Sequence, residues 1–248
     1  MNDPTRAAER ATDKAPGSRR LYQQIADRLR ELIRQGQFGV GSRLPPEREL
    51  AQQLGVSRPS VREALIALEI AGCVEVRMGA GIYVREAAVA AGDAAVTAGL
   101  GDSLGDSPME LMQARAMLEG ALMAPACVRA TPEGLRPVRE ALDEMRQAMQ
   151  AGRSALDADR RFHVAVAALA GNAVLERLVA ELFDGRYSPI TLQLSAKADT
   201  RQTWQDALRE HERILHALEA RDPLAAQVAM QHHLLSAHER WAGNGMAP

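Results

Sequence analysis

Residues 44–65 read LPPERELAQQLGVSRPSVREAL, and this stretch decides the fold of the N-terminal part of the chain. Pro46 suits the first position of a helix, and Leu50 and Leu54 follow four residues apart, on one inward-facing side. Gly55 ends that helix after barely two turns, because glycine accepts the backbone conformation that a sharp turn requires. The pattern predicts a short helix followed by a tight turn.

A second helix is expected directly after this turn. Ser57 fits its N-cap, and Pro59 lies just inside it. Its apolar stripe ends before Gly72 and consists of Val61, Leu65, Leu68 and Ile70. A short helix, a turn with glycine and a second helix are typical of a helix-turn-helix, in which the second helix meets the base edges of DNA.

The flanking segments predict a winged form of this motif. Upstream, apolar residues recur at helical steps from residue 21, and the run stops at Gly36. Downstream, residues 73–77 and 82–84 are β-rich and enclose Gly79-Ala80-Gly81, which indicates a hairpin whose glycines allow close approach to DNA. Residues 18–85 are therefore expected to form three helices plus a two-stranded wing.

The polar residues of the helix-turn-helix suit DNA recognition. Arg58 and Arg62 lie four residues apart, so we expect them on one face, opposite the apolar stripe, where arginine can donate two hydrogen bonds to guanine. Arg48 could reach a base or a phosphate, and Ser57 and Ser60 could donate to phosphate. The alternative is a solvated arginine face paired with nearby glutamates. The turn, the paired arginines and the wing together favour DNA.

The distribution of charged residues also separates the predicted DNA-binding part from the rest of the chain. The net charge is −2, but residues 18–84 carry 10 Arg against 7 acidic residues, whereas residues 85–248 carry 17 basic against 22 acidic residues. A basic N-terminal part followed by an acidic remainder is expected when the first contacts DNA phosphates and the second does not.

The remainder predicts an all-α domain. We expect a disordered tail over residues 1–17, an Ala- and Gly-rich linker over 86–106, and a six- or seven-helix bundle over 107–242. Breaks at Pro and Gly place helices near 108–130, 133–151, 154–169, 172–196, 199–221 and 222–242.

Four residues of this part could hold a metal ion. Asp159 and His163 are four apart on one helix, and the apolar spacing around His211 and His233 turns both inward. One carboxylate and three imidazoles suit Zn²⁺, Ni²⁺, Mn²⁺ or Fe²⁺. Each histidine taken alone could equally be a packed core residue.

Residues 19–84 resemble the winged-helix domain of GntR-type bacterial regulators. The resemblance rests on the runs PERELA (46–51), SR (57–58) and VREAL (61–65), and on Gly79-x-Gly81-x-x-Val84. It implies that Arg48, Arg58 and Arg62 read the major groove and that Gly79 marks the tip of the wing.

Residues 108–242 resemble the FCD ligand-binding domain of the fatty-acid-regulator-like branch of that family. The matching patterns are Asp159-x-x-Phe162-His163, Glu210-His211-x-x-Ile214-Leu215, Asp222 and His233-Leu234. The resemblance implies Asp159, His163, His211 and His233 as metal ligands. It also implies an effector carboxylate between the metal and Arg115, although Arg115 could instead only pair with Glu119.

Other classes of protein fit less well. No apolar run approaches the roughly 20 residues of a membrane span, and the two cysteines form no paired motif, so we expect a cytoplasmic protein without a membrane partner. An enzyme would use the metal for catalysis, but the HERILH run (211–216) is one residue longer than the zinc-protease motif. A purely structural metal in a dimerisation domain stays an alternative.

The sequence thus leads to one hypothesis. A homodimer binds an inverted-repeat operator on double-stranded DNA, and a small carboxylate effector at the metal reorients the winged domains through the linker. Repression relieved by the effector is favoured over activation.

Overall fold

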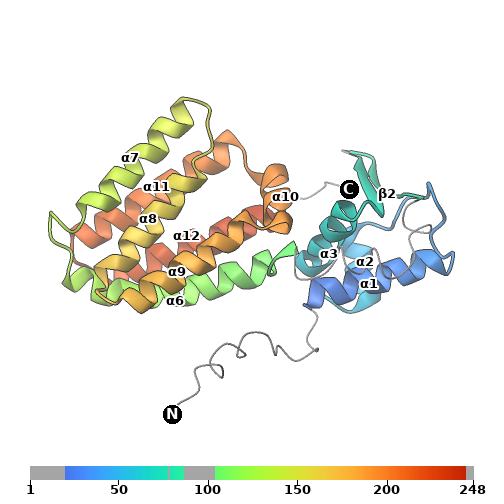
Figure 1. The fold of residues 1–248 in the computed structure, drawn as a ribbon, viewed down its shortest axis with the longest axis horizontal. Coiled ribbons are helices and arrows are strands. Elements are labelled where there is room, and N and C mark those ends of the chain that lie inside the picture. The colour runs from blue at the N-terminus through green and yellow to red at the C-terminus, as the bar shows by residue number, and fades with distance from the viewer. Residues whose placement is uncertain (1–19, 78, 87–103, 244–248) are drawn as a thin grey trace, which may run out of the picture.

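The computed structural model describes residues 20–77, 79–86 and 104–243. Its N-terminal part comprises α1 (Leu21–Arg34), α2 (Glu47–Leu54), α3 (Arg58–Ile70), β1 (Val74–Arg77) and β2 (Gly81–Val84) (Figure 1). The predicted three helices and two-stranded wing are therefore confirmed. The expected tail, most of the expected linker (residues 87–103) and Met78 lie outside the described residues.

Local chemistry explains the turn between α2 and α3. Gly55 adopts the left-handed conformation, with φ 68° and ψ 31°, which a side chain would disfavour. The Ser57 hydroxyl then caps α3 by accepting a hydrogen bond from the Ser60 N–H at 3.2 Å. Helix α1 packs against α3, and its Ile25 and Leu29 are buried in the core.

The wing is an antiparallel hairpin. Its register runs from Val74 opposite Val84 to Arg77 opposite Gly81. Val74 and Val84 are buried against the helices, which fixes the hairpin on the domain. Gly79 lies at the turn with φ 71°.

The C-terminal part is entirely helical. Its elements are α6 (Pro108–Val128), α7 (Arg136–Gln150), α8 (Leu156–Leu169), α9 (Ala173–Asp184), the 3₁₀ turn η3 (Gly185–Tyr187), α10 (Pro189–Ala198), α11 (Arg201–Glu219) and α12 (Pro223–Gly243). One expectation was wrong: residues 172–196 are two helices and not one. Ser188 is extended, with ψ 150°, because the next residue is Pro189, which disfavours the helical conformation before it.

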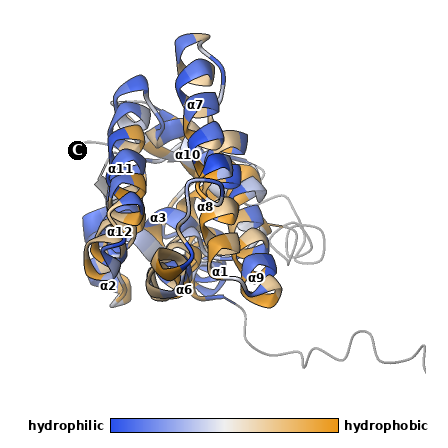
Figure 2. Cartoon of the chain, turned by 90° about the vertical axis from the view of Figure 1, so that its left-hand side faces the viewer, coloured by the Kyte–Doolittle hydropathy of each residue, from blue (hydrophilic) through white to orange (hydrophobic). Residues whose placement is uncertain are grey.

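The helices pack as a bundle around a core between α6, α8, α11 and α12. α12 lies along α6 and α11, and α7 lies along α8 (Figure 1). α7 shows the two-sided pattern that this requires, with Val138, Leu142 and Met145 buried and hydrophilic residues on its outer turns (Figure 2). None of the described helices is long and apolar enough to cross a membrane.

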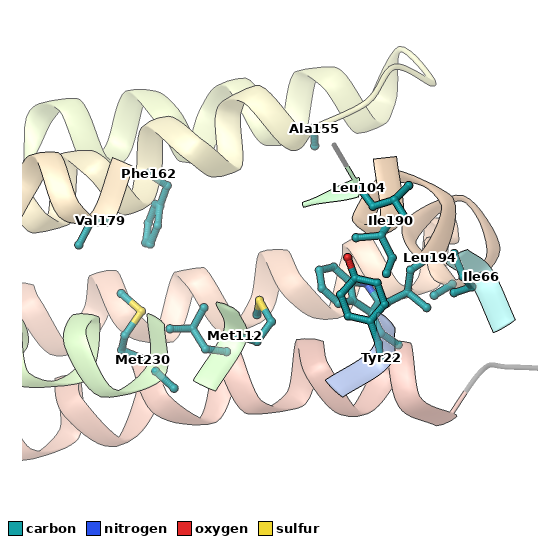
Figure 3. Close-up of a cluster of buried hydrophobic side chains, with 14 of the residues drawn as sticks. Tyr22, Ile66, Leu104, Met112, Ala155, Phe162, Val179, Ile190, Leu194 and Met230 are labelled. Carbon is teal, nitrogen blue, oxygen red and sulfur yellow. The ribbon is translucent and has the colours of Figure 1, made fainter. Parts of the chain in front are cut away.

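The two parts share one hydrophobic cluster. Figure 3 shows Ile66 of α3 beside Leu194 and Ile190 of α10, with Tyr22 and Leu104 next to them. Polar contacts add to this interface, since Glu69 of α3 pairs with Lys197 of α10. Helix α3 is therefore docked directly on the helical part.

Glu63 is a buried acid in this interface. Its carboxylate accepts hydrogen bonds from the Ser107 hydroxyl at 2.8 Å and from the Met109 N–H at 3.0 Å. Desolvation by burial nevertheless raises the pKa of Glu63 to about 7.

This pKa predicts a pH-dependent stability. Between about pH 4.5 and pH 7, Glu63 is protonated in the folded state but ionised in the unfolded state. The free energy of unfolding therefore falls as the pH rises through this range. The expected loss at pH 7 is about 3 kcal/mol, and Glu63→Gln should remove that dependence. Urea unfolding at pH 5, 6 and 7 measures it, with Glu69→Gln as the matched variant on the same helix. Parallel pH profiles for wild type and Glu63→Gln would contradict the assignment.

Candidate functional site

Four ionisable side chains meet at the centre of the helical bundle. Asp159 and His163 come from α8, His211 from α11 and His233 from α12, and all four are buried. One potential ligand atom of each lies within 4.8 Å of the others. The structure therefore brings together the four residues that the sequence singled out for a metal.

The three imidazoles are oriented by acceptors on their outer nitrogens. His211 Nδ1 lies 2.8 Å from the Ala207 carbonyl oxygen, which can only accept, so Nδ1 donates and Nε2 keeps its lone pair. His163 Nδ1 lies 2.5 Å from Glu119, and His233 Nδ1 lies 2.8 Å from Glu210. Such outer hydrogen bonds fix the tautomer that leaves Nε2 for an ion.

On the inner side of the cluster, two imidazole nitrogens and a carboxylate oxygen face one another. His211 Nε2 lies 3.3 Å from His163 Nε2 and 3.1 Å from Asp159 Oδ1. Asp159 Oδ1 is buried and has no hydrogen-bond partner among the residues that the structure describes. A cation satisfies these lone pairs together, so the donor set fits a divalent metal with nitrogen and oxygen ligands.

Charge states in the cluster follow from burial and neighbours. Burial lowers the pKa of His233 to about 3, and it also lowers the pKa of His211, so both are neutral at pH 7 and suited to bind a cation. Burial acts the same way on His163, but the Glu119 carboxylate outweighs it and raises the pKa of His163. A metal ion must therefore displace a proton from His163.

A cavity of about 390 Å³, including its open mouth, adjoins this cluster. Asp159 and His233 line it together with Arg115, whose side chain is 1% exposed. The Arg115 Nε donates to Glu119 at 2.7 Å, as the pairing alternative expected. However, Arg115 Nη2 is buried and has no partner within residues 20–77, 79–86 and 104–243, so it can still donate to a ligand.

The sequence reasoning missed a second arginine in this wall. Arg186, in η3, donates from Nη1 to Asp159 Oδ2, and none of the described residues accepts from its buried Nε. The predicted continuous helix over 172–196 concealed this position, because η3 interrupts it. The only two tryptophans of the chain, Trp204 and Trp241, also line the cavity, and their rarity was an available signal.

The proposed DNA readers fall into two groups. Arg48, Ser57 and Arg58 are exposed at the starts of α2 and α3, and Gly79 is exposed on the wing. Ser60 is only 2% exposed, and its hydroxyl lies 2.8 Å from that of Ser57. Ser60 therefore acts in the cap of α3 in this conformation and does not face solvent.

Arg62 differs from expectation. It is 5% exposed and its guanidinium holds the Glu47 carboxylate through two bonds of 2.9 and 2.6 Å. Its Nη1 donates to the Trp241 carbonyl oxygen at 2.8 Å. The expectation of an exposed face shared with Arg58 is wrong for this conformation, because α12 covers that side of α3.

Two family models match the chain in succession. Residues 21–84 match the model described as bacterial regulatory proteins, gntR family, and residues 110–236 match the FCD domain. Together they cover most of the residues that the structure describes.

Curated relatives match along nearly the full length. The Uxu operon transcriptional regulator of Escherichia coli K12 is 38% identical over 91% of this chain and 88% of its own length. The Exu regulon transcriptional regulator of the same strain is 37% identical over 87% of this chain and 82% of its own length. Among solved structures, one titled for Lar, which controls expression of the Listeria monocytogenes agr system, shares 18% identity. It has a TM-score of 0.50 over 91% of this chain and 98% of its own, and shows the fold alone.

Proposed function

Because the chain belongs to the gntR family of bacterial regulatory proteins and carries an FCD domain, we propose that it is a cytoplasmic, sequence-specific repressor controlled by a small organic acid. Like these relatives, the chain is a transcription regulator, and it is not an enzyme. The observation that carries the finer proposal is the buried Asp159 and three-histidine cluster, which opens into a cavity lined by arginine.

DNA recognition rests on the exposed polar residues of the winged domain. Arg48 and Arg58 read base edges in the major groove, Ser57 contacts phosphate, and the wing approaches the backbone at Gly79. Arg62 and Ser60 join them only when α3 is freed from its present partners. Two such domains bind half-sites of an inverted repeat about one helical turn apart.

The sensing site combines the cluster and the cavity. Asp159, His163, His211 and His233 hold Zn²⁺, Ni²⁺, Mn²⁺ or Fe²⁺, which supplies a Lewis-acid centre for a carboxylate. Arg115 Nη2 donates to the same carboxylate from the cavity wall.

A second copy of the chain covers an apolar face of α6 and α12. Met117 and Val128 of α6 are 74% and 75% exposed, and Leu224 and Val228 of α12 are 72% and 56% exposed. α6 lies along α12, so these residues belong to neighbouring helices. Apolar side chains exposed to this degree on adjacent helices are typical of a subunit interface.

The interface makes a prediction about assembly. Val228→Glu is expected to weaken the dimer at least 10-fold, because it buries an unpaired carboxylate. Sedimentation velocity across a concentration series measures this. Gln147→Glu adds the same charge on the exposed side of α7 and should leave the dimer unchanged; equal dissociation of both variants would contradict the interface.

The decisive test of the proposal has two parts. Operator DNA is first selected from a random-sequence pool with the zinc-loaded protein. Thermal shifts are then measured for mono- and dicarboxylates on chelated and metal-reloaded protein. Stabilisation by an acid only with metal, together with release of the operator by the same acid, supports the proposal. Metal-dependent stability without any acid response would instead favour a structural metal.

A further inference from the structure

Arg186 is held in the cavity by a partner that a metal ion would compete for. Its Nη1 donates to Asp159 Oδ2, its Nε has no partner in the described part of the chain, and its side chain is 11% exposed. The Asp159 carboxylate is also the one oxygen ligand in the metal cluster. When a cation binds this carboxylate, the carboxylate neutralises much less of the positive charge of Arg186.

The charges around the cavity then require an anion. Two neutral ion pairs lie beside the cavity: Arg115 with Glu119, and Arg186 with Asp159. Asp199 adds one negative charge to the lining, so a divalent cation leaves a net positive charge in this buried region, where uncompensated charge is costly. Two buried arginines with unpartnered nitrogens therefore face the same cavity as the cation.

The other lining groups indicate what the rest of the ligand carries. Asp199 lines the cavity and accepts a hydrogen bond from the Trp241 indole at 3.3 Å through Oδ1. A carboxylate has several acceptor positions, so Asp199 can also accept a hydrogen bond from a ligand hydroxyl, whereas it would repel a second carboxylate. The rings of Trp204 and Trp241 offer flat apolar surfaces to C–H groups.

We propose that Arg186 is a second carboxylate-binding residue and that Asp199 selects a hydroxylated monocarboxylic acid. This inference rests on the proposed function, since it names the class of acid for the same site. Arg186 acts together with Arg115 on the carboxylate, and Asp199 accepts from a hydroxyl further along the ligand.

Six-carbon acids test this inference. Binding of gluconate, glucuronate, hexanoate and adipate to the zinc-loaded full chain is measured by calorimetry. We expect at least one hydroxylated acid to bind 10-fold or more tightly than hexanoate and adipate. Arg186→Gln should weaken that binding about 10- to 100-fold with zinc content unchanged, and Arg186→Lys should restore part of it. Asp199→Ala should remove the preference over hexanoate.

The possible results distinguish failure of the proposed function from failure of this inference alone. If no acid binds with zinc present, both the proposed function and this inference fail. If acids bind but hexanoate or adipate binds as tightly as the hydroxylated acids, or if Arg186→Gln binds like wild type, only the inference is overturned. Melting temperatures of the zinc-loaded variants show whether each one folds.

A second inference rests on a different contact, that of Arg62 with α12. Trp241 is 5% exposed; its carbonyl oxygen accepts from Arg62 while its indole donates to Asp199 in the cavity. One residue thus contacts both a predicted DNA reader and the sensing cavity. A second, smaller pocket between the two parts is also lined by Arg62 and Trp241.

We infer that Trp241 is an autoinhibitory latch that holds Arg62 away from DNA. The latched arrangement is the form with low operator affinity. An acid that packs against the Trp241 ring stabilises this form, which gives the sign of a repressor released by its effector.

The latch is testable without any effector. Trp241→Ala keeps the carbonyl that Arg62 binds but removes the buried indole that anchors the end of α12. We expect this end of α12 to release Arg62 and operator affinity to rise about 10-fold in fluorescence anisotropy. Glu239→Ala changes an exposed residue two positions away on the same helix and should leave operator affinity unchanged. In an Arg62→Gln background, Trp241→Ala should give no increase. Unchanged or weaker operator binding by a folded Trp241→Ala protein, with an unaltered melting temperature, would overturn the latch.

Discussion

Arg58→Ala is expected to lower specific operator affinity about 10- to 100-fold while binding to unrelated DNA falls much less. Arg58 is exposed at the first position of α3, where its fork can donate two hydrogen bonds to a guanine. Each such pair contributes about 1–3 kcal/mol of discrimination. Non-specific binding depends mainly on total charge, from which one residue is removed.

Gel shifts on the selected operator and on a scrambled sequence, at one salt concentration, measure both quantities. Arg153→Ala removes an equally exposed arginine from the helical part and should change neither. If Arg58→Ala bound the operator as tightly as wild type, α3 would not be the recognition helix.

His211→Ala is expected to abolish stable metal binding and the stabilisation that metal provides. His211 is fully buried, and its Nε2 faces both His163 and Asp159. A metal present at 100 to 1,000 times its Kd stabilises the folded chain by about 3–4 kcal/mol, so metal should raise the Tm of wild type but not of the variant. Any acid response that requires metal should vanish with it.

The matched control lies on the same helix. His216 is exposed on α11, so His216→Ala removes an imidazole without touching the cluster. Metal content after dialysis and Tm with and without added zinc compare the two variants. A His211→Ala protein that retains one tightly bound zinc would refute the assignment, and His211→Gln separates ligand loss from the cavity that alanine leaves beside Phe162.

Several features were predictable because they depend on residues close in sequence. Gly55 requires a turn, Ser57 caps the next helix, and the β-rich segments around Gly79 form the hairpin. The break at Pro189 was missed, although the residue before a proline disfavours helix. The signal was local, but the apolar periodicity of residues 172–196 continued across it.

The cluster of Asp159 and three histidines was only partly predictable from the sequence. Asp159 and His163 are one helical turn apart, so their common face is a property of the sequence. Periodicity also turned His211 and His233 inward, but it could not give the distance between three helices. That distance depends on how α8, α11 and α12 pack, and the ligand atoms of all four residues meet within 4.8 Å.

The sequence by itself determined the winged helix-turn-helix, the helical C-terminal part and the residue types that could hold a metal. These follow from turn chemistry, helix capping and side-chain periodicity, which act over a few residues. Only the tertiary structure decided that Arg62 is covered, because its partners Glu47 and Trp241 are 15 and 179 residues away. The same holds for Arg186, which reaches Asp159 across 27 residues. Burial and pairing of a charged side chain depend on which distant segments pack around it, and no local pattern records that.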